Sequence, residues 1–275
     1  MRQLLYSLNR RDVLRNWISA VSNCRTRNGR RSWAAPLLFC VMLITSQCAD
    51  NELASTSGLT GKGGSLARFA VTPTHLYAVD NTTLHVYKFE LNGSTTLVNS
   101  VDLGGGVETI AARGTQLFIG TNQAMIIYDI SSADIPQYLS QYNHFAGCDP
   151  VVVQDTLAFV TLRTTGCRPS SVNTLDIINI KIPTQPSVIA SYGLQSPYGL
   201  GIDGELLFVC EGENGLKIFN VKDPHNPQVV KNYDVDAFDV IANNGILLLT
   251  GKHGIVQYDY SDQQNIKELS TISIQ

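Results

Sequence analysis

Short apolar runs separated by turn residues recur from residue 64 to the end of the chain. Residues 107–142 show this pattern most clearly, with four segments that favour β-strands at 107–111, 117–120, 124–130 and 137–142. β-Branched and aromatic residues fill these segments, and Gly, Asn, Asp and Pro separate them. No helical period of 3.6 residues persists through this region. The pattern therefore predicts four short strands and no helix.

The four-strand pattern repeats five times with a period of about 41 residues. Two series of large residues keep this period. The first series is Tyr77, Phe118, Phe159, Phe208 and Leu249, and the second is Tyr87, Tyr128, Ile178, Phe219 and Tyr258. A four-stranded antiparallel unit repeated at this interval is typical of a β-propeller, in which stacked blades cover each other's faces. A β-sandwich is the alternative, but it would not keep a fixed period.

We therefore expect an all-β fold over residues 64–275, a β-propeller of about five four-stranded antiparallel blades. The blades are expected to begin near Gly64, Gly104, Ala146, Ser196 and Asp236. A ring of blades has to close. Either the first and last blades meet directly, or residues near Leu59 add a closing strand.

Residues 1–47 differ in composition from the rest of the chain. They hold eight Arg, no Lys and a single acid, which leaves 12 basic and 22 acidic residues in the remainder. A basic stretch, an apolar run at 33–45 and then polar residues predict a secretory signal peptide. The run is shorter than the roughly 20 residues of a membrane span, and a buried helix is the alternative. The acidic remainder argues against a nucleic-acid partner, because phosphate binding needs clustered bases.

The end of the apolar run resembles a bacterial lipoprotein signal, in which a Cys is lipidated and becomes the new N-terminus. Here Cys48 holds that position, although Thr45 and Gln47 depart from the usual Leu and small residue. Lipidation would anchor the protein to a membrane of the bacterial cell envelope, at the outer membrane, the periplasm or the surface. Cleavage nearby, giving a free secreted protein, is the alternative. Residues 48–63 are expected to form a flexible tether.

Export to an oxidising compartment changes what the cysteines are expected to do. Cys148 and Cys167 lie 19 residues apart and bracket the one repeat that carries an insertion, so we predict a disulfide between them. Closing a loop of that size stabilises a fold by about 3 kcal/mol in the chain-entropy description. Cys210 lies in an apolar strand and is expected to be a buried, unreactive thiol.

Four repeats share a motif in which an apolar strand is followed by an acidic or amide residue and a turn that often contains proline. The four are MIIYDISSADIPQYL, LDIINIKIPTQPSVI, LKIFNVKDPHNPQVV and IVQYDYSDQQNIKEL, and the first repeat, LHVYKFELNGSTTLV, has lost the acidic residue and the prolines. The motif resembles that of the LVIVD-repeat proteins of bacteria over about residues 64–275. The resemblance implies a β-propeller. It implies no activity, because that family has none in general.

One position of the repeat carries several acidic residues. The residues ten places before the first series are Ala67, Glu108, Asp149, Tyr198 and Asp239. They start the innermost strands, so in a propeller they would form a ring at one mouth of the axis. Clustered carboxylates repel each other unless a proton, a hydrogen bond or a cation intervenes, and oxygen ligands suit Ca²⁺ or Mg²⁺. Glu108, Asp149 and Asp239 are therefore candidate metal ligands, and with Tyr198 they are candidates for binding another ligand. A water-filled channel with polar strand ends is the alternative.

The insertion in the third repeat, residues 162–172, places Arg163 and Arg168 on an otherwise acidic body. Loops of this kind on a rigid scaffold often carry recognition, although a loop without function is the alternative. No zinc-ligand spacing, nucleotide-binding loop or serine-hydrolase motif is present. We favour a platform that binds a protein or small molecule. The alternatives are a hydrolase or lyase that uses the axial carboxylates, and a structural assembly factor.

Overall fold

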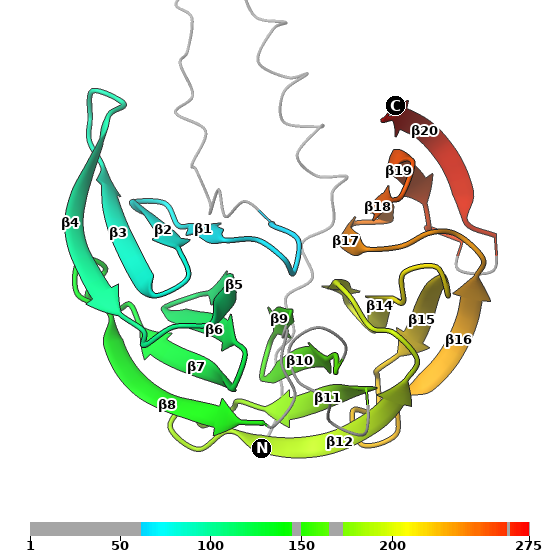
Figure 1. The fold of residues 1–275 in the computed structure, drawn as a ribbon, viewed down its shortest axis with the longest axis horizontal. Coiled ribbons are helices and arrows are strands. Elements are labelled where there is room, and N and C mark those ends of the chain that lie inside the picture. Colours follow the sequence, from blue (N-terminus) through cyan, green and yellow to red (C-terminus); the bar gives the residue numbers. More distant parts are fainter. Residues whose placement is uncertain (1–61, 145–149, 165–172, 263–264, 275) are drawn as a thin grey trace, which may run out of the picture. The chain divides into compact units, whose positions relative to one another are not determined.

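The computed structural model describes residues 62–144, 150–164, 173–262 and 265–274. These residues form five four-stranded antiparallel sheets, each a simple meander along the chain (Figure 1). The protein is a five-bladed β-propeller, as the repeat predicted. The predicted signal peptide, most of the tether and Leu59 lie outside the described residues.

Each blade begins with its innermost strand and ends with its outermost one. The strands are β1 Phe69–Val71, β2 His75–Val79, β3 Thr83–Phe89 and β4 Thr95–Asp102 in the first blade; β5 Val107–Arg113, β6 Gln116–Thr121, β7 Ala124–Asp129 and β8 Gln137–Asn143 in the second; β9 Val151–Gln154, β10 Leu157–Leu162, β11 Asn173–Asn179 and β12 Ser187–Leu194 in the third; β13 Leu200–Asp203, β14 Leu206–Cys210, β15 Leu216–Asn220 and β16 Gln228–Tyr233 in the fourth; and β17 Asp239–Asn243, β18 Ile246–Gly251, β19 Gly254–Asp259 and β20 Lys267–Ser273 in the fifth. The four strands predicted for the second repeat are confirmed to within two residues at each end.

Among the described residues, the core consists of four apolar clusters, one at each seam between consecutive blades. The aromatic residues of the first series fill these seams. Tyr77, Phe118 and Phe208 are fully buried, and Phe159 is 1% exposed. Burying one such side chain stabilises a fold by about 1.5–3 kcal/mol. The seams, rather than a single central core, therefore hold the blades together.

The second series of repeat residues marks a recurring bulge. In all five blades the pairing between the third and fourth strands shifts at this position, for example between Val86 and Tyr87 and between Ile218 and Phe219. A bulge bends the strand and increases its twist. Because the bulge occurs at the equivalent residue of every blade, the third and fourth strands bend at the same point in all five.

The acidic or amide residue of the repeat motif has a local structural role. Asp129, Asn179, Asn220 and Asp259 each accept a hydrogen bond from the backbone N–H two residues later, at 2.8–2.9 Å. This is the Asx turn, which replaces a missing backbone partner where a strand ends. The motif is therefore explained by the turn between the third and fourth strands.

One position of the repeat alignment, Leu249 in the fifth blade, was assigned incorrectly. Tyr77, Phe118, Phe159 and Phe208 all face the following blade, whereas Leu249 packs in the seam with the preceding one. The equivalent residue is Leu248, which is 40% exposed. Because side chains alternate along a strand, a shift of one residue moves the aligned position to the opposite face.

The described chain enters the propeller at its hub. Residues 62–67 cross the centre before β1, and Figure 1 shows them reaching toward the fourth and fifth blades. The Ser65 hydroxyl donates a hydrogen bond to Asp239 on β17 at 3.0 Å and accepts one from the Leu200 backbone N–H at 2.7 Å. The backbone N–H of Ile110 on β5 donates to the Ala67 carbonyl. This segment thus ties the two ends of the blade series together.

Within the described residues, no helix has the length and apolar character that crossing a bilayer would require.

Candidate functional site at the hub mouth

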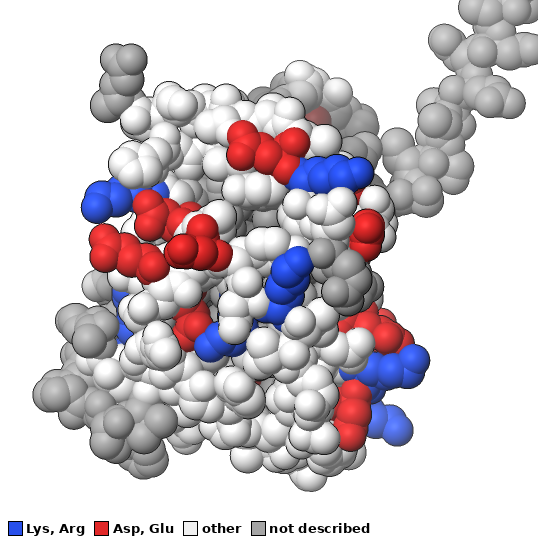
Figure 2. All heavy atoms as spheres, turned by 90° about the vertical axis from the view of Figure 1, so that its right-hand side faces the viewer, with Lys and Arg blue, Asp and Glu red and all other residues white. Residues whose placement is uncertain are grey.

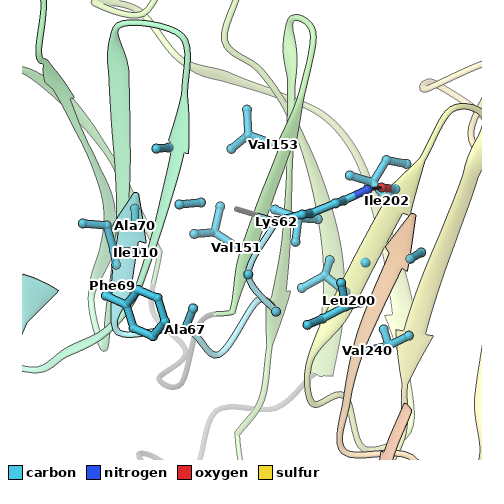
Figure 3. A pocket seen from close by; sticks show the side chains of 18 of the residues that line it. Lys62, Ala67, Phe69, Ala70, Ile110, Val151, Val153, Leu200, Ile202 and Val240 are labelled. Carbon is cyan, nitrogen blue, oxygen red and sulfur yellow. Dashed lines mark hydrogen bonds between the residues drawn. The ribbon is translucent and has the colours of Figure 1, made fainter. Parts of the chain in front are cut away.

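The centre of the propeller is apolar. A cavity of about 110 Å³ lies there, lined by the inner strands of all five blades, with Val151, Leu200 and Val240 among its walls (Figure 3). Small-molecule sites usually occupy about 300–1,000 Å³. The hub therefore has no room for a ligand of ordinary size.

Lys62 places a charged group at one end of this apolar centre. Its ammonium donates a hydrogen bond to the Ile202 carbonyl at 2.7 Å (Figure 3). Burial lowers the pKa of Lys62, and the nearby Asp203 acts in the opposite direction. The contact fixes the entering segment against β13 near one end of the hub.

Asp239, a candidate metal ligand, holds the hub segment. Its carboxylate accepts hydrogen bonds from the Ser65 hydroxyl and from the backbone N–H groups of Ser65, Leu66 and Val240. Burial raises the pKa of Asp239, and these hydrogen bonds offset part of that rise. The described contacts of this carboxylate are thus structural.

Two glycines leave space for the Asp239 carboxylate. A Cβ on Gly64 or on Gly199 would overlap its oxygens, and at Gly199 a Cβ would also lie 2.9 Å from the Asp239 Cα. Real Cβ atoms essentially never approach so closely. The close packing of three chain segments around Asp239 therefore depends on the absence of side chains at these positions.

Tyr198 and Arg163, which the sequence marked for different reasons, meet at this mouth. The Arg163 guanidinium carbon lies 4.0 Å from the centroid of the Tyr198 ring. A cation over a tyrosine face is attracted by about 0.5–2 kcal/mol, depending on exposure. The Thr161 hydroxyl donates to the Tyr198 carbonyl at 2.7 Å, which joins the two chain segments. The insertion-bearing blade thus places one cation over the rim of the hub.

The neighbours of Tyr198 fix the orientation of its ring. Phe238 packs edge-on against it, with centroids 5.0 Å apart. Gly212 lies against another part of the ring, where a Cβ would come within 2.6 Å, and its φ of +61° favours glycine. Tyr198 is therefore a rigid platform for Arg163.

A buried ion pair lies beside this platform, and the sequence did not reveal it. Glu211 is 2% exposed, and its carboxylate lies 2.6 Å from the Lys217 ammonium. The other carboxylate oxygen accepts a hydrogen bond from the Gln195 backbone N–H at 2.7 Å. Removing one member of such a pair leaves an uncompensated buried charge. The pair thus fixes the loop that leads to Tyr198.

The predicted cation site is only partly within the described chain. Glu108 is a half-buried bulge residue of β5, and Asp149 lies outside the described residues. In the described ranges, no group of three or more His, Cys, Asp or Glu side chains is arranged to hold a metal ion. A Ca²⁺ or Mg²⁺ site that includes Asp149 stays a prediction.

Several other predicted residues also lie outside the described ranges. These are Cys48, Cys148, Cys167 and Arg168, so the lipidation, the disulfide and the outer part of the recognition loop stay predictions. Cys210, in contrast, is fully buried and free, as expected from its apolar strand. Burial raises the pKa of its thiol, which keeps it unreactive.

Charges of both signs are interspersed over the side of the propeller that carries the last blades (Figure 2). Lys222 and Glu205 of the fourth blade form an exposed pair, 3.2 Å apart. For the described residues on that side, no broad basic surface of the kind that binds a phosphate backbone is visible in Figure 2.

The fold and this rim define the class of protein, a compact five-bladed propeller with an apolar hub and a charged, aromatic mouth. No family model and no curated protein matches the chain. The likeness to LVIVD-repeat proteins therefore rests on the repeat motif alone.

Solved structures resemble the fold. A functionally unknown protein from Desulfotomaculum acetoxidans aligns with a TM-score of 0.61 at 9% identity, over 74% of this chain and 67% of that one. A protein from Lactobacillus plantarum has a TM-score of 0.57 at 12% identity, with 74% of each chain covered. Apo AztD from Citrobacter koseri has a TM-score of 0.53 at 13% identity, and this chain spans 62% of its length. At these identities the likeness is one of fold alone.

Proposed function

We propose that this protein is an exported binding platform, anchored to the bacterial cell envelope through a lipid on Cys48. Its propeller recognises a protein or small ligand at the hub mouth, around Arg163 and Tyr198. The basic and apolar segments before Cys48 support export. The repeated four-stranded blades form a rigid scaffold, which suits a protein that presents a binding surface to a partner.

The stacking of Arg163 on Tyr198 is the observation that carries the proposal. The tyrosine face orients the guanidinium at the rim of a hub too small to hold a ligand of ordinary size. Arginine presents a planar fork of N–H donors that matches carboxylates and other oxyanions. The expected partner therefore presents an anionic group to this rim.

A site-directed cross-linking experiment tests the proposal. A photoreactive amino acid at Glu213, 76% exposed on a turn of the same mouth, should form a defined adduct in membranes that contain the full chain. The same amino acid at Lys222, 75% exposed on a turn between the third and fourth strands of that blade, is the matched control.

Arg163→Ala should reduce the Glu213 adduct at least five-fold. Losing an interaction worth 1.4 kcal/mol of binding free energy weakens the affinity about ten-fold, so a five-fold loss of adduct is expected even if the adduct reports only part of that change. Equal adducts from both positions, or an adduct that Arg163→Ala leaves unchanged, would contradict recognition at this mouth.

A further inference from the structure

The wall of the hub cavity contains a single polar side chain among the described residues. All the other lining residues are Gly, Ala, Val, Ile, Leu or Phe, and the exception is Lys62. Figure 3 shows the Lys62 side chain extending across the cavity to Ile202, whose carbonyl accepts its hydrogen bond. Phe69 in the same wall is 56% exposed, and Lys62 is exposed as well, so a solute can reach the cavity. An otherwise apolar chamber thus holds one accessible amine.

The surroundings of Lys62 differ from those of the lysines that form ion pairs. The ammonium groups of Lys217, Lys222 and Lys252 lie 2.6–3.5 Å from carboxylate oxygens. Lys62 instead donates to an uncharged backbone carbonyl, at 2.7 Å. Burial, the largest influence on the pKa of Lys62, lowers that pKa, and Asp203 opposes the effect. A lysine desolvated beside apolar groups becomes a neutral amine at lower pH than an exposed one, which makes it a better nucleophile.

The size of the cavity limits what can lie beside this amine. Its volume is about 110 Å³. An apolar cavity of about 150 Å³ in another protein holds benzene, so this one suits a smaller group, such as an alkyl chain of about three or four carbons. A carboxylate on that chain would bring a second negative charge near Asp203, whereas an uncharged carbonyl group would not. The walls and the amine therefore favour a short, neutral, electrophilic molecule.

We propose that Lys62 is a covalent binding site for short aliphatic aldehydes, whose alkyl chains fill the hub cavity. The lone pair of Nζ adds to the aldehyde carbon, and one amine proton moves to the oxygen, which gives a carbinolamine. The hydroxyl group then leaves with the second amine proton as water, and a C=N double bond forms. Amine and aldehyde thus become imine and water, with no oxidant or reductant required.

This site is separate from the rim around Arg163. The Lys62 ammonium contacts Ile202 near the end of β13, whereas Tyr198, which stacks on Arg163, precedes that strand. A ligand at Lys62 would accordingly occupy the hub itself.

Reductive trapping tests the proposal with the purified full chain. Cyanoborohydride converts an imine into a stable secondary amine, and peptide mass spectrometry then gives the occupancy of each lysine. With butanal, trapping at Lys62 should exceed that at Lys222, whose side chain is 75% exposed, at least ten-fold. From ethanal to butanal the occupancy of Lys62 should rise about four-fold for each added methylene, because each one is removed from water in the cavity. Octanal should gain nothing further, and Lys222 should show no dependence on chain length.

A substitution in the cavity wall separates the effect of the cavity from that of the amine. Val153→Phe enlarges a lining side chain and should abolish the dependence on chain length at Lys62, with trapping at Lys222 unchanged. Val188→Phe, at a position 49% exposed on β12, is the matched control and should behave as the wild type.

The aldehyde series on the wild-type chain decides the matter even where Val153→Phe does not fold. Equal trapping at Lys62 and Lys222, or equal occupancy of Lys62 with ethanal and butanal, overturns the proposal. An unaltered series in folded Val153→Phe overturns it as well.

Discussion

Gly199→Ala is the substitution for which the structure gives the sharpest expectation. The new Cβ would overlap the Asp239 carboxylate and lie 2.9 Å from the Asp239 Cα, so a rotation of the side chain alone would not relieve the contact. Gly193→Ala is the matched control, because nothing lies within 4 Å of a Cβ at that position.

Overpacking of this kind costs about 1–3 kcal/mol in the free energy of unfolding. For a domain of about 200 residues, 1 kcal/mol shifts Tm by roughly 2–4 °C. Gly199→Ala should therefore lower Tm by about 2–12 °C. Gly193→Ala should leave Tm unchanged or raise it slightly, because alanine reduces the conformational entropy of the unfolded chain.

Thermal unfolding followed by circular dichroism measures both variants under identical conditions. Combining Gly199→Ala with Asp239→Ala removes the overlapping carboxylate, so the two effects should be less than additive. If Gly199→Ala is as stable as Gly193→Ala, the close packing described around Asp239 is incorrect.

Three further predictions concern other parts of the chain. A hydrogen bond from His75, at 2.6 Å, is the largest cause of the lowered pKa of Asp134, so this carboxylate stabilises the fold above its unfolded pKa and loses that effect as the pH falls. The Tm deficit of Asp134→Asn should consequently be largest near pH 7 and shrink below about pH 4, and a constant deficit would refute this. Cys48→Ala should move the protein from the membrane to the soluble fraction, as judged by fractionation and immunoblotting, and retention in the membrane would exclude the lipid anchor. Mass spectrometry after alkylation without reductant should find Cys148 and Cys167 unmodified, and labelling of both would exclude their disulfide.

The strands were predictable because their determinants are local. In the second blade, apolar alternation and turn residues located β5 to β8 within two residues. The repeat then extended this result to all five blades. The same reasoning was wrong by one position at Leu249. Shifting the alignment of a strand by one residue moves the aligned side chain to the opposite face of the sheet, and here both candidate positions are leucine, so the residue type gave no warning.

The site was less predictable, because its contacts join distant segments. Arg163 and Tyr198 were each marked by the sequence, but nothing local to either one indicated that they stack. The Glu211–Lys217 pair had no sequence signal that distinguishes it from exposed charges. Asp239 was correctly placed at the start of an innermost strand, yet its bond to Ser65 spans 174 residues and could not be read from spacing.

That long span has a consequence for how the polypeptide assembles. Each seam joins blades that are adjacent in the chain, so these contacts can form in order as synthesis proceeds, at modest loop-closure cost. The Ser65–Asp239 bond has to wait until β17 has emerged, since its acceptor belongs to the last blade. Fastening of the hub segment to the last blade is therefore a late event, and a nascent chain halted before β17 could hold this segment through Leu200 on β13 but not through Asp239.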